Sequence, residues 1–237
     1  MTKLRILPAL ILCCLTLPLM AQTPVPSDAT LFKKDAVILF QGDSITDGNR
    51  GRSEDPNHIH GHGYVYLIAS YLGANFPENN RVFYNRGVSG NTVVRLAERW
   101  RTDTLDLHPD VLSIMIGAND FCGVGGETTP EEFERNYDRL LAETVEALPE
   151  VKLILMEPYW SDERGNEVAE GFRSAVRRLA EKYHAVFVPL QEEFDRHLDR
   201  GPDRYWIWDK VHPTTAGHWI ITQQWLNAVR SFEKSVP

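Results

Sequence analysis

Five short runs of apolar residues, each of strand length, are spaced along the chain between longer segments of mixed polarity. They lie at 36–41, 81–85, 110–116, 151–156 and 185–189. Each run is rich in Val, Ile, Leu or Phe without strict alternation, which is typical of parallel strands that are covered on both faces. The pattern therefore predicts five strands of a mostly parallel sheet.

The segments between these runs carry the three- or four-residue spacing of amphipathic helices. The clearest is 130–148, preceded by Thr129-Pro130-Glu131-Glu132, which predicts a capping box with proline at the first helical position. The same spacing predicts helices over 168–183 and 214–232. Strands that alternate with helices predict an α/β fold, a three-layer α/β/α sandwich around a mostly parallel five-stranded sheet.

The first residues of the chain differ in character from the rest. Residues 1–21 place Lys3 and Arg5 before an apolar run that ends at Ala21, the layout of a secretory signal peptide. The run is short for a bilayer span and contains two prolines, so no stable membrane anchor is expected. We interpret 22–35, rich in Pro, Ser, Thr and Asp, as a linker and 36–237 as one catalytic domain, exported and therefore secreted or periplasmic.

The charge of the chain narrows the choice of partners. Its net charge is −8, and removal of the leader with Lys3 and Arg5 would bring it to −10. A negative protein repels nucleic acid and anionic membrane surfaces, so we expect neither as a partner. Cys122 is the one cysteine outside the leader, which excludes an intramolecular disulfide in the mature chain and leaves stability to packing.

Residues that directly follow parallel strands line the crevice where ligands bind, and the first such position is Ser44. It lies in Gly42-Asp43-Ser44-Ile45-Thr46, where glycine permits a tight turn and the serine stands near the amino end of the next helix. Such a serine is well placed as a nucleophile. The same position is also typical of an ordinary helix cap.

Two further strand ends carry hydrogen-bond donors. Gly87, within Asn85-Arg-Gly-Val-Ser-Gly-Asn91, can present a backbone N–H without side-chain obstruction. Asn119, within Gly117-Ala-Asn-Asp120, can direct its amide at the same centre while Asp120 braces the loop. Each is compatible with an ordinary glycine-containing loop or an Asx turn when taken alone.

A carboxylate and an imidazole stand three residues apart just before the last predicted helix, in Asp209-Lys-Val-His212-Pro213. With Ser44, Gly87 and Asn119, these residues form four blocks that resemble the GDSL or SGNH hydrolase family in order, spacing and strand-end placement. The resemblance extends from Ala36 to the carboxyl terminus. Its one departure is Ile45, where the name-giving pattern has leucine.

The resemblance implies a flavodoxin-like SGNH hydrolase fold and a serine esterase. Ser44 would be the nucleophile, His212 with Asp209 would complete the triad, and Ser44, Gly87 and Asn119 would form the oxyanion hole. Elementary chemistry agrees, because an alcohol needs an adjacent base to accept its proton, and an imidazole titrates near neutral pH. Neither a cofactor nor a metal is expected, since the triad needs no ion.

Three histidines, His58, His60 and His62, alternate in the loop after Ser44 and raise the alternative of a zinc site. No acidic or cysteine partner pattern accompanies them, so a polar wall of the cleft is the preferred interpretation. The loop also contains Arg50 and Arg52, and its polarity favours a hydrophilic substrate.

Aromatic residues gather near the predicted site at Tyr159, Trp160, Tyr205, Trp206 and Trp208, and flat rings suit stacking on sugars as well as packing in a core. The substrate is therefore predicted to be a small-molecule or oligosaccharide ester, and the enzyme an O-acetylesterase on carbohydrate. The alternatives are a lysophospholipase or thioesterase, and a non-catalytic saccharide-binding protein of the same fold.

Overall fold

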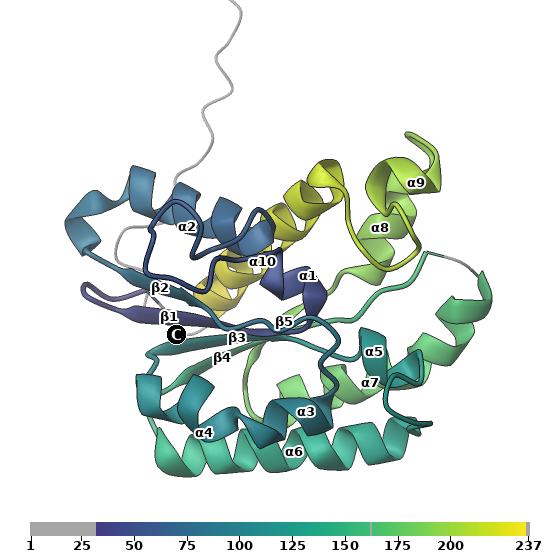
Figure 1. The fold of residues 1–237 in the computed structure, drawn as a ribbon, viewed down its shortest axis with the longest axis horizontal. Helices are drawn as coiled ribbons and strands as arrows, with labels where there is room; N and C mark the ends of the chain where they lie inside the picture. Colours follow the sequence, from purple (N-terminus) through teal and green to yellow (C-terminus); the bar gives the residue numbers. More distant parts are fainter. Residues whose placement is uncertain (1–31, 162, 236–237) are drawn as a thin grey trace, which may run out of the picture.

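A computed structural model describes residues 32–161 and 163–235. The predicted leader 1–21 and residues 22–31 of the predicted linker 22–35 lie outside the described residues. At the centre is a five-stranded sheet, parallel throughout, in the order β2-β1-β3-β4-β5 (Figure 1). Its strands are β1 (Val37–Gly42), β2 (Val82–Asn85), β3 (Val111–Met115), β4 (Lys152–Met156) and β5 (Val186–Val188).

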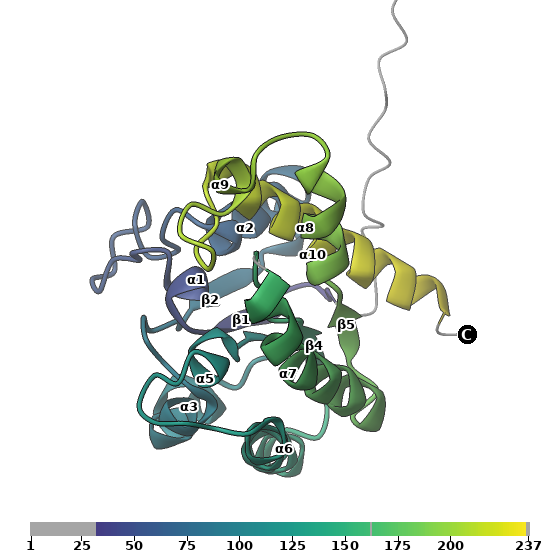
Figure 2. The ribbon, with the colours of Figure 1, turned by 90° about the vertical axis from the view of Figure 1, so that its right-hand side faces the viewer.

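Helices cover both faces of this sheet. One layer contains α2 (Tyr64–Asn75), α8 (Gln191–Leu198) and α10 (Thr215–Ser235), and the other contains α3 (Val93–Glu98), α4 (Trp100–Asp103), α6 (Pro130–Ala147) and α7 (Glu163–Lys182) (Figures 1 and 2). Three single-turn helices lie in loops: α1 (Ser44–Asp47), α5 (Ala118–Phe121) and α9 (Asp203–Trp206). Short 3-10 turns occur at Pro77–Asn79 and Leu105–Leu107.

Alternate residues of each strand supply the two hydrophobic cores. Ile38 and Phe40 of β1 join the cluster under α2 and α10, whereas Leu39 between them joins the cluster under α6 and α7. In β4, Ile154 and Leu155 divide in the same way. Side chains alternate across a strand, so a strand buried on both faces must be apolar at every position. The three-layer α/β fold that the sequence predicts is confirmed, and each strand lies within two residues of its predicted bounds.

The predicted capping box at the start of α6 is also confirmed. Thr129 Oγ1 accepts from the Glu132 N–H at 3.2 Å, and Glu132 Oε2 accepts from the Thr129 N–H at 3.2 Å. By contrast, the pattern does not reveal α2, because the helix is apolar on most of its circumference and shows no clear stripe. No helix among residues 32–161 and 163–235 has the length and apolarity needed to cross a membrane.

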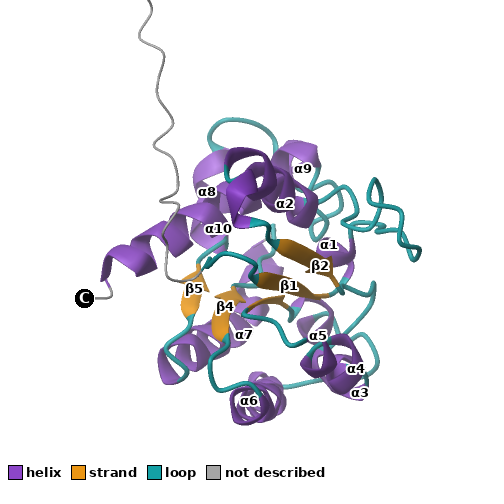
Figure 3. Cartoon of the chain, turned by 90° about the vertical axis from the view of Figure 1, so that its left-hand side faces the viewer, coloured by secondary structure: helices purple, strands orange, loops and turns teal. Residues whose placement is uncertain are grey.

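The strand order fixes where the loops meet. From β1 the chain turns to β2 on one side, and from β3 it turns to β4 and β5 on the other. In Figure 3 the sheet lies between the two helical layers, with α2 on one side of it and α6 on the other. Ligands bind at such a switch point, beyond the carboxyl ends of the strands. The loops after the neighbouring strands β1 and β3 are those that carry Ser44 and Asn119.

Candidate active site

Ser44 stands at the first position of α1, directly beyond the end of β1. The preceding Asp43 caps this helix through its side chain, which accepts from the Ile45 N–H at 3.0 Å. A side chain at Gly42 would place its Cβ 2.3 Å from the oxygen of Met115, so the turn from strand to helix requires glycine. The serine is thus held at the sheet edge with its hydroxyl directed out of the core.

His212 and Asp209 form a chain of hydrogen bonds with that hydroxyl. The distance from Ser44 Oγ to His212 Nε2 is 2.7 Å, and that from His212 Nδ1 to Asp209 Oδ2 is also 2.7 Å. The sequence analysis predicts this triad, and the structure brings its three members together across 168 positions of sequence. The arrangement leaves Nδ1 to donate to the carboxylate and Nε2 to accept the hydroxyl proton.

Asp209 is also bonded to the backbone of its own loop. Its Oδ1 accepts from the N–H of His212 at 2.7 Å and from the N–H of Val211 at 3.2 Å. Partial burial works in the opposite direction, but these hydrogen bonds and the one from the imidazole hold the pKa of Asp209 below its ordinary value. The carboxylate is therefore charged where it faces the histidine ring.

The loop itself is closed at its base by the isolated bridge between Ile207 and Pro213. The Trp208 N–H donates to the oxygen of His212 at 3.0 Å, and Lys210 adopts a left-handed conformation with φ of 78°. A non-glycine residue in this region stores strain that the surrounding contacts must offset. The loop is consequently a fixed platform for the imidazole.

Asn119, which the sequence analysis places in the oxyanion hole, extends from the loop after β3. Its Nδ2 donates to the backbone oxygen of Asn91 at 2.9 Å. A primary amide has two N–H donors, so this bond orients the group and leaves one donor available. The backbone N–H of Ser44 is the second predicted donor, and no partner for it occurs among the described residues.

The backbone N–H of Gly87, predicted to be an oxyanion donor, already donates to another residue. Its N–H donates to Asn85 Oδ1 at 3.0 Å, and Asn85 is itself buried and bonded to the oxygen of Thr46 in α1. A Cβ at Gly87 would lie 2.3 Å from the nitrogen of Asp47, so this glycine is needed for the close approach of its loop to α1. For Gly87 to act as an oxyanion donor, the bond to Asn85 would have to break.

Gly90, later in the same loop, is a residue that the sequence reasoning missed. Its φ is 78°, and within the described ranges its N–H has no hydrogen-bond partner. The residue that follows it, Asn91, is the one that accepts from Asn119. The signal that could have singled it out is the second glycine of Gly87-Val-Ser-Gly90.

Two buried carboxyls lie behind the site, one next to Ser44 and one next to Asn119. Burial raises the pKa of Asp43 to about 7, against the hydrogen bond from Ile45 that lowers it, and the charge of Asp120 adds to the rise. Burial likewise raises the pKa of Asp120 to about 6, although its carboxylate accepts from the Val93 N–H at 3.0 Å. That bond confirms the predicted bracing role of Asp120.

Arg99 is a further residue that the sequence does not single out. Its guanidinium donates to the oxygens of Gly42 and Arg86 at 3.3 and 2.8 Å, and to Asn91 Oδ1 at 2.7 Å. It also contacts Asp103 at 2.9 Å. One side chain therefore ties the turn before Ser44 to the loop that contains Gly87 and Gly90.

The aromatic residues predicted around the site divide into two groups. Tyr159 is buried and packs on Phe194, so it belongs to the core. Trp208 is 65% exposed and its ring centroid lies 6.4 Å from that of His212, while Tyr205 is 58% exposed. The exposed ring of Trp208 beside the imidazole offers a flat surface to an incoming substrate.

The three histidines of the loop after α1 do not converge. Among the residues that the structure describes, no group of three or more His, Cys, Asp or Glu side chains is placed to hold a metal ion. His60 is half-buried and meets Phe83 edge-on at 6.4 Å, and burial lowers its pKa. The segment packs over the free edge of β2.

A parallel sheet with serine, histidine and aspartate joined at its carboxyl edge is the arrangement of an SGNH-type hydrolase. The profile of the GDSL-like lipase/acylhydrolase family matches residues 40–220, which is well over half of the chain. The protein belongs to this family and is an esterase-class acylhydrolase.

Individual relatives agree with this assignment. An acetylxylan esterase of Geobacillus stearothermophilus is 35% identical over 208 residues, which cover 81% of this chain and 93% of that protein. Its crystal structure matches with a TM-score of 0.78 and 32% identity over 84% of this chain and 95% of that one. A GDSL-like protein of Parabacteroides merdae matches with a TM-score of 0.80 and 39% identity, covering 84% of this chain and 97% of that one. The homology extends over nearly the whole described region.

Proposed function

We propose that this esterase removes acetyl groups from acetylated carbohydrate, with Ser44 as the nucleophile, His212 as the general base and Asp209 as its orienting partner. The observation that carries the proposal is the unbroken hydrogen-bond chain from Ser44 Oγ through the imidazole to Asp209. Similarity to an acetylxylan esterase over 81% of this chain and 93% of that protein supports the choice of substrate class.

In the acylation step, Ser44 Oγ attacks the carbonyl carbon of the acetyl ester while its proton passes to His212 Nε2. The imidazolium that forms is stabilised by the charged Asp209 carboxylate, whose pKa is held low by its hydrogen bonds. The C–O bond to the sugar then breaks, and Nε2–H protonates the departing alkoxide. The acetyl group remains bound to Ser44 Oγ as an ester.

In the deacylation step, water takes the place of the sugar hydroxyl. His212 Nε2 accepts a proton from that water as its oxygen attacks the acetyl carbon, and then returns the proton to Ser44 Oγ as acetate leaves. Each step develops a negative charge on the carbonyl oxygen. The imidazole acts once as base and once as acid in both halves of the cycle.

The proposed oxyanion donors are N–H groups of the three loops that have no other hydrogen-bond partner in the described part of the chain. The Ser44 N–H is the first, and the unused amide hydrogen of Asn119 is the second. Of the two glycines in the loop after β2, Gly90 is the better third donor, because the Gly87 N–H is bonded to Asn85. In this assignment Gly87 has a packing role and permits the close approach of the loop to α1.

Two features favour a sugar acetate over a lipid ester. The segment after Ser44 is polar and contains Arg50 and Arg52, and the exposed ring of Trp208 lies near His212. Sugar rings stack on exposed aromatics, whereas a long acyl chain needs an enclosed apolar channel. An acetyl group requires no such channel.

The test is a substrate panel measured on the wild type and on Ser44→Ala. Chromogenic esters from acetyl to palmitoyl are compared with acetylated xylo-oligosaccharides, whose acetate release is followed directly. We expect kcat/KM to fall with chain length and acetylated oligosaccharides to be turned over. Ser44→Ala should lose activity on every substrate.

Three outcomes would contradict this assignment. Preference for long-chain esters or thioesters would favour the lysophospholipase or thioesterase alternative. Ester hydrolysis that persists in Ser44→Ala would remove the catalytic role of the triad, and oligosaccharide binding without hydrolysis would favour a non-catalytic saccharide-binding protein.

We also propose that the enzyme is exported, with cleavage after residue 21 and action outside the cytoplasm. The proposal depends on the charged, apolar and proline-containing order of residues 1–21. Expression of the full chain followed by amino-terminal sequencing of the extracellular or periplasmic fraction tests it. An uncleaved chain retained in the cytoplasm would contradict it.

A further inference from the structure

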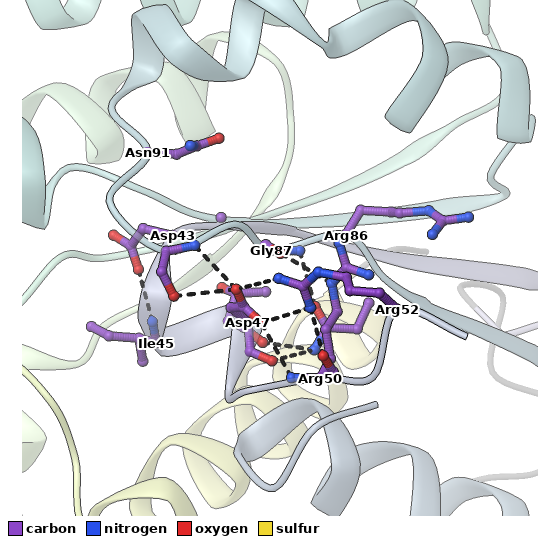
Figure 4. Close-up of polar contacts among 12 residues, drawn as sticks. Asp43, Ile45, Asp47, Arg50, Arg52, Arg86, Gly87 and Asn91 are labelled. Carbon is purple, nitrogen blue, oxygen red and sulfur yellow. Dashed lines mark hydrogen bonds and ion pairs between the residues drawn. The ribbon is translucent and has the colours of Figure 1, made fainter. Parts of the chain in front are cut away.

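A cavity of about 580 Å³ opens between the loop after α1 and the free edge of β2. Residues 50–54 and Ile59 form one wall, and residues 83–86 form the other. Three of its lining residues are arginines, Arg50, Arg52 and Arg86, in a chain whose net charge is −8. In Figure 4 the guanidinium of Arg52 contacts Asp47, whereas that of Arg50 donates to Gly87, the residue that follows Arg86.

The three guanidinium groups differ in how many of their N–H donors form hydrogen bonds. Arg52 binds both carboxylate oxygens of Asp47, at 3.1 and 2.7 Å, and is neutralised by it. Arg50 donates only its Nε, to the oxygen of Gly87 at 3.0 Å. Arg86 lies over the ring of Tyr84 at 5.5 Å, and its Nε is buried with no hydrogen-bond partner in the described structure.

The nearby carboxylates do not neutralise the positive charges of Arg50 and Arg86. Asp47 is bonded to Arg52, and Asp103 is paired with Arg99 at 2.9 Å. Glu54 lines the cavity on the exposed loop, and within the described ranges it forms no ion pair. Burial is the main cause that lowers the pKa of Arg50 to about 10, and the charges of Arg52 and Arg86 add to the fall.

The cavity adjoins the loops of the active site. Arg50 binds the backbone of Gly87, and Asp47 belongs to α1, the helix that begins at Ser44. Asp47 Oδ2 also accepts from the N–H of Ser89 at 3.1 Å. A group bound at Arg50 would therefore lie next to the loop that contains Gly87 and Ser89.

We propose that this cavity binds the carboxylate of an acidic sugar unit in the acetylated oligosaccharide, with Arg50 and Arg86 as its anion ligands. A guanidinium matches a carboxylate in shape and charge, with two parallel N–H donors for two oxygens. Ile59 and Phe83 add an apolar wall for the ring that carries the acid. This inference depends on the proposed function for its substrate class, but the binding itself does not depend on catalysis.

The experiment measures binding by calorimetry in a Ser44→Ala background, so that no ester is consumed. The ligands are a xylo-oligosaccharide with one glucuronic acid side group and the same backbone without it. The variants are Arg86→Gln and Arg50→Gln, with Arg101→Gln as the matched control because Arg101 is exposed elsewhere on the surface. Inorganic phosphate is the competing anion.

We expect the acidic ligand to bind at least about tenfold more tightly than the neutral one, and Arg86→Gln to abolish this preference. The control should keep it, and added salt should weaken it. Equal binding of the two ligands by the unaltered cavity would overturn the proposal, as would a preference that survives both arginine substitutions.

Two further results separate this proposal from related ones. Phosphate that binds at least as tightly as the acidic oligosaccharide would overturn the assignment to an acidic sugar. Arginine-dependent binding of the acidic ligand by a protein that deacetylates no carbohydrate would support the site and contradict the proposed function.

Discussion

The side-chain amide of Asn119 donates to the backbone oxygen of Asn91, and this bond fixes the orientation of a group in α5, directly after β3. We expect Asn119→Ala to lower kcat about 10²- to 10³-fold, because it removes one donor to the developing oxyanion. KM should change little. Initial rates on an acetyl ester provide the measurement.

Asn119 is partly buried, so its replacement must be separated from misfolding. A thermal unfolding curve of Asn119→Ala that stays close to that of the wild type is the control. If kcat falls less than about fivefold in a variant that is fully folded, the amide does not act on the transition state.

Asp209→Asn tests the orientation of the imidazole. The backbone N–H groups of Val211 and His212 hold the amide oxygen at the Oδ1 position, so the amide nitrogen faces Nδ1. That nitrogen can only donate, so the ring loses the tautomer that presents Nε2 as a base. We expect kcat to fall about 10³-fold or more, with KM nearly unchanged. Asp209→Asn that retains a tenth of wild-type kcat would show that the backbone of residues 207–213 orients the ring without the carboxylate.

The raised pKa values of Asp43 and Asp120 predict that the free energy of unfolding falls as the pH rises. Their pKa values of about 7 and about 6 lie above the ordinary value of 3.8, so the folded protein binds these protons more tightly than the unfolded chain. Their contribution is full below about pH 4 and is lost as the pH passes through 6 and 7. The free energy of unfolding, measured by denaturant titration from pH 5 to pH 8, follows the change.

Asp43→Asn keeps an oxygen that can cap α1 and removes one of these titrations. We expect the decline in stability between pH 5 and pH 8 to become shallower in this variant. Asp199→Asn makes the same chemical change at an exposed position and serves as the control. A pH profile that is identical in wild type and Asp43→Asn would contradict the assigned titration.

Arg99→Gln should destabilise the protein by about 3 kcal/mol, because it leaves the buried acceptors of several loops without a donor. Denaturant unfolding measures the loss. Arg101→Gln, at a side chain that is 81% exposed, should cost less than about 0.5 kcal/mol. Similar losses in the two variants would exclude a positioning role for Arg99.

Thr129→Ala removes half of the capping box of α6 and should lower the free energy of unfolding by about 1 kcal/mol. α6 packs on α7 in the layer opposite α2 and α10, so kcat should be unaffected. Thr129→Ser, which keeps the hydroxyl, should recover most of the stability. Failure of the serine to do so would point to lost packing rather than a lost cap.

The strands and the triad could be predicted because their signals are local. A run such as 110–116 is apolar at every position whatever its neighbours are, and Ser44, Asp209 and His212 each sit in a short motif. Their convergence was inferred from the rule that strand ends meet at one edge of the sheet and from the family resemblance. The distances of 2.7 Å confirm that they meet.

Relations between distant segments could not be predicted in the same way. Nothing near Arg99 in sequence indicates that it binds the oxygens of Gly42 and Arg86, and nothing near Gly87 shows that Asn85 takes its N–H. Tyr159 and Trp208 are both aromatic residues in loops, yet one is buried and the other exposed. These differences arise from packing, which a linear pattern does not record.

The serine and the imidazole come from opposite ends of the domain, and this has a consequence for synthesis. A nascent chain has produced all five strands once Val188 is made, yet it still lacks the loop of residues 207–213 that supplies the base. Ser44 in such an intermediate is an ordinary alcohol. A chain that lacks residues 207–213 is therefore an inert precursor, and it becomes a hydrolase only after this segment has been made and His212 has reached Ser44.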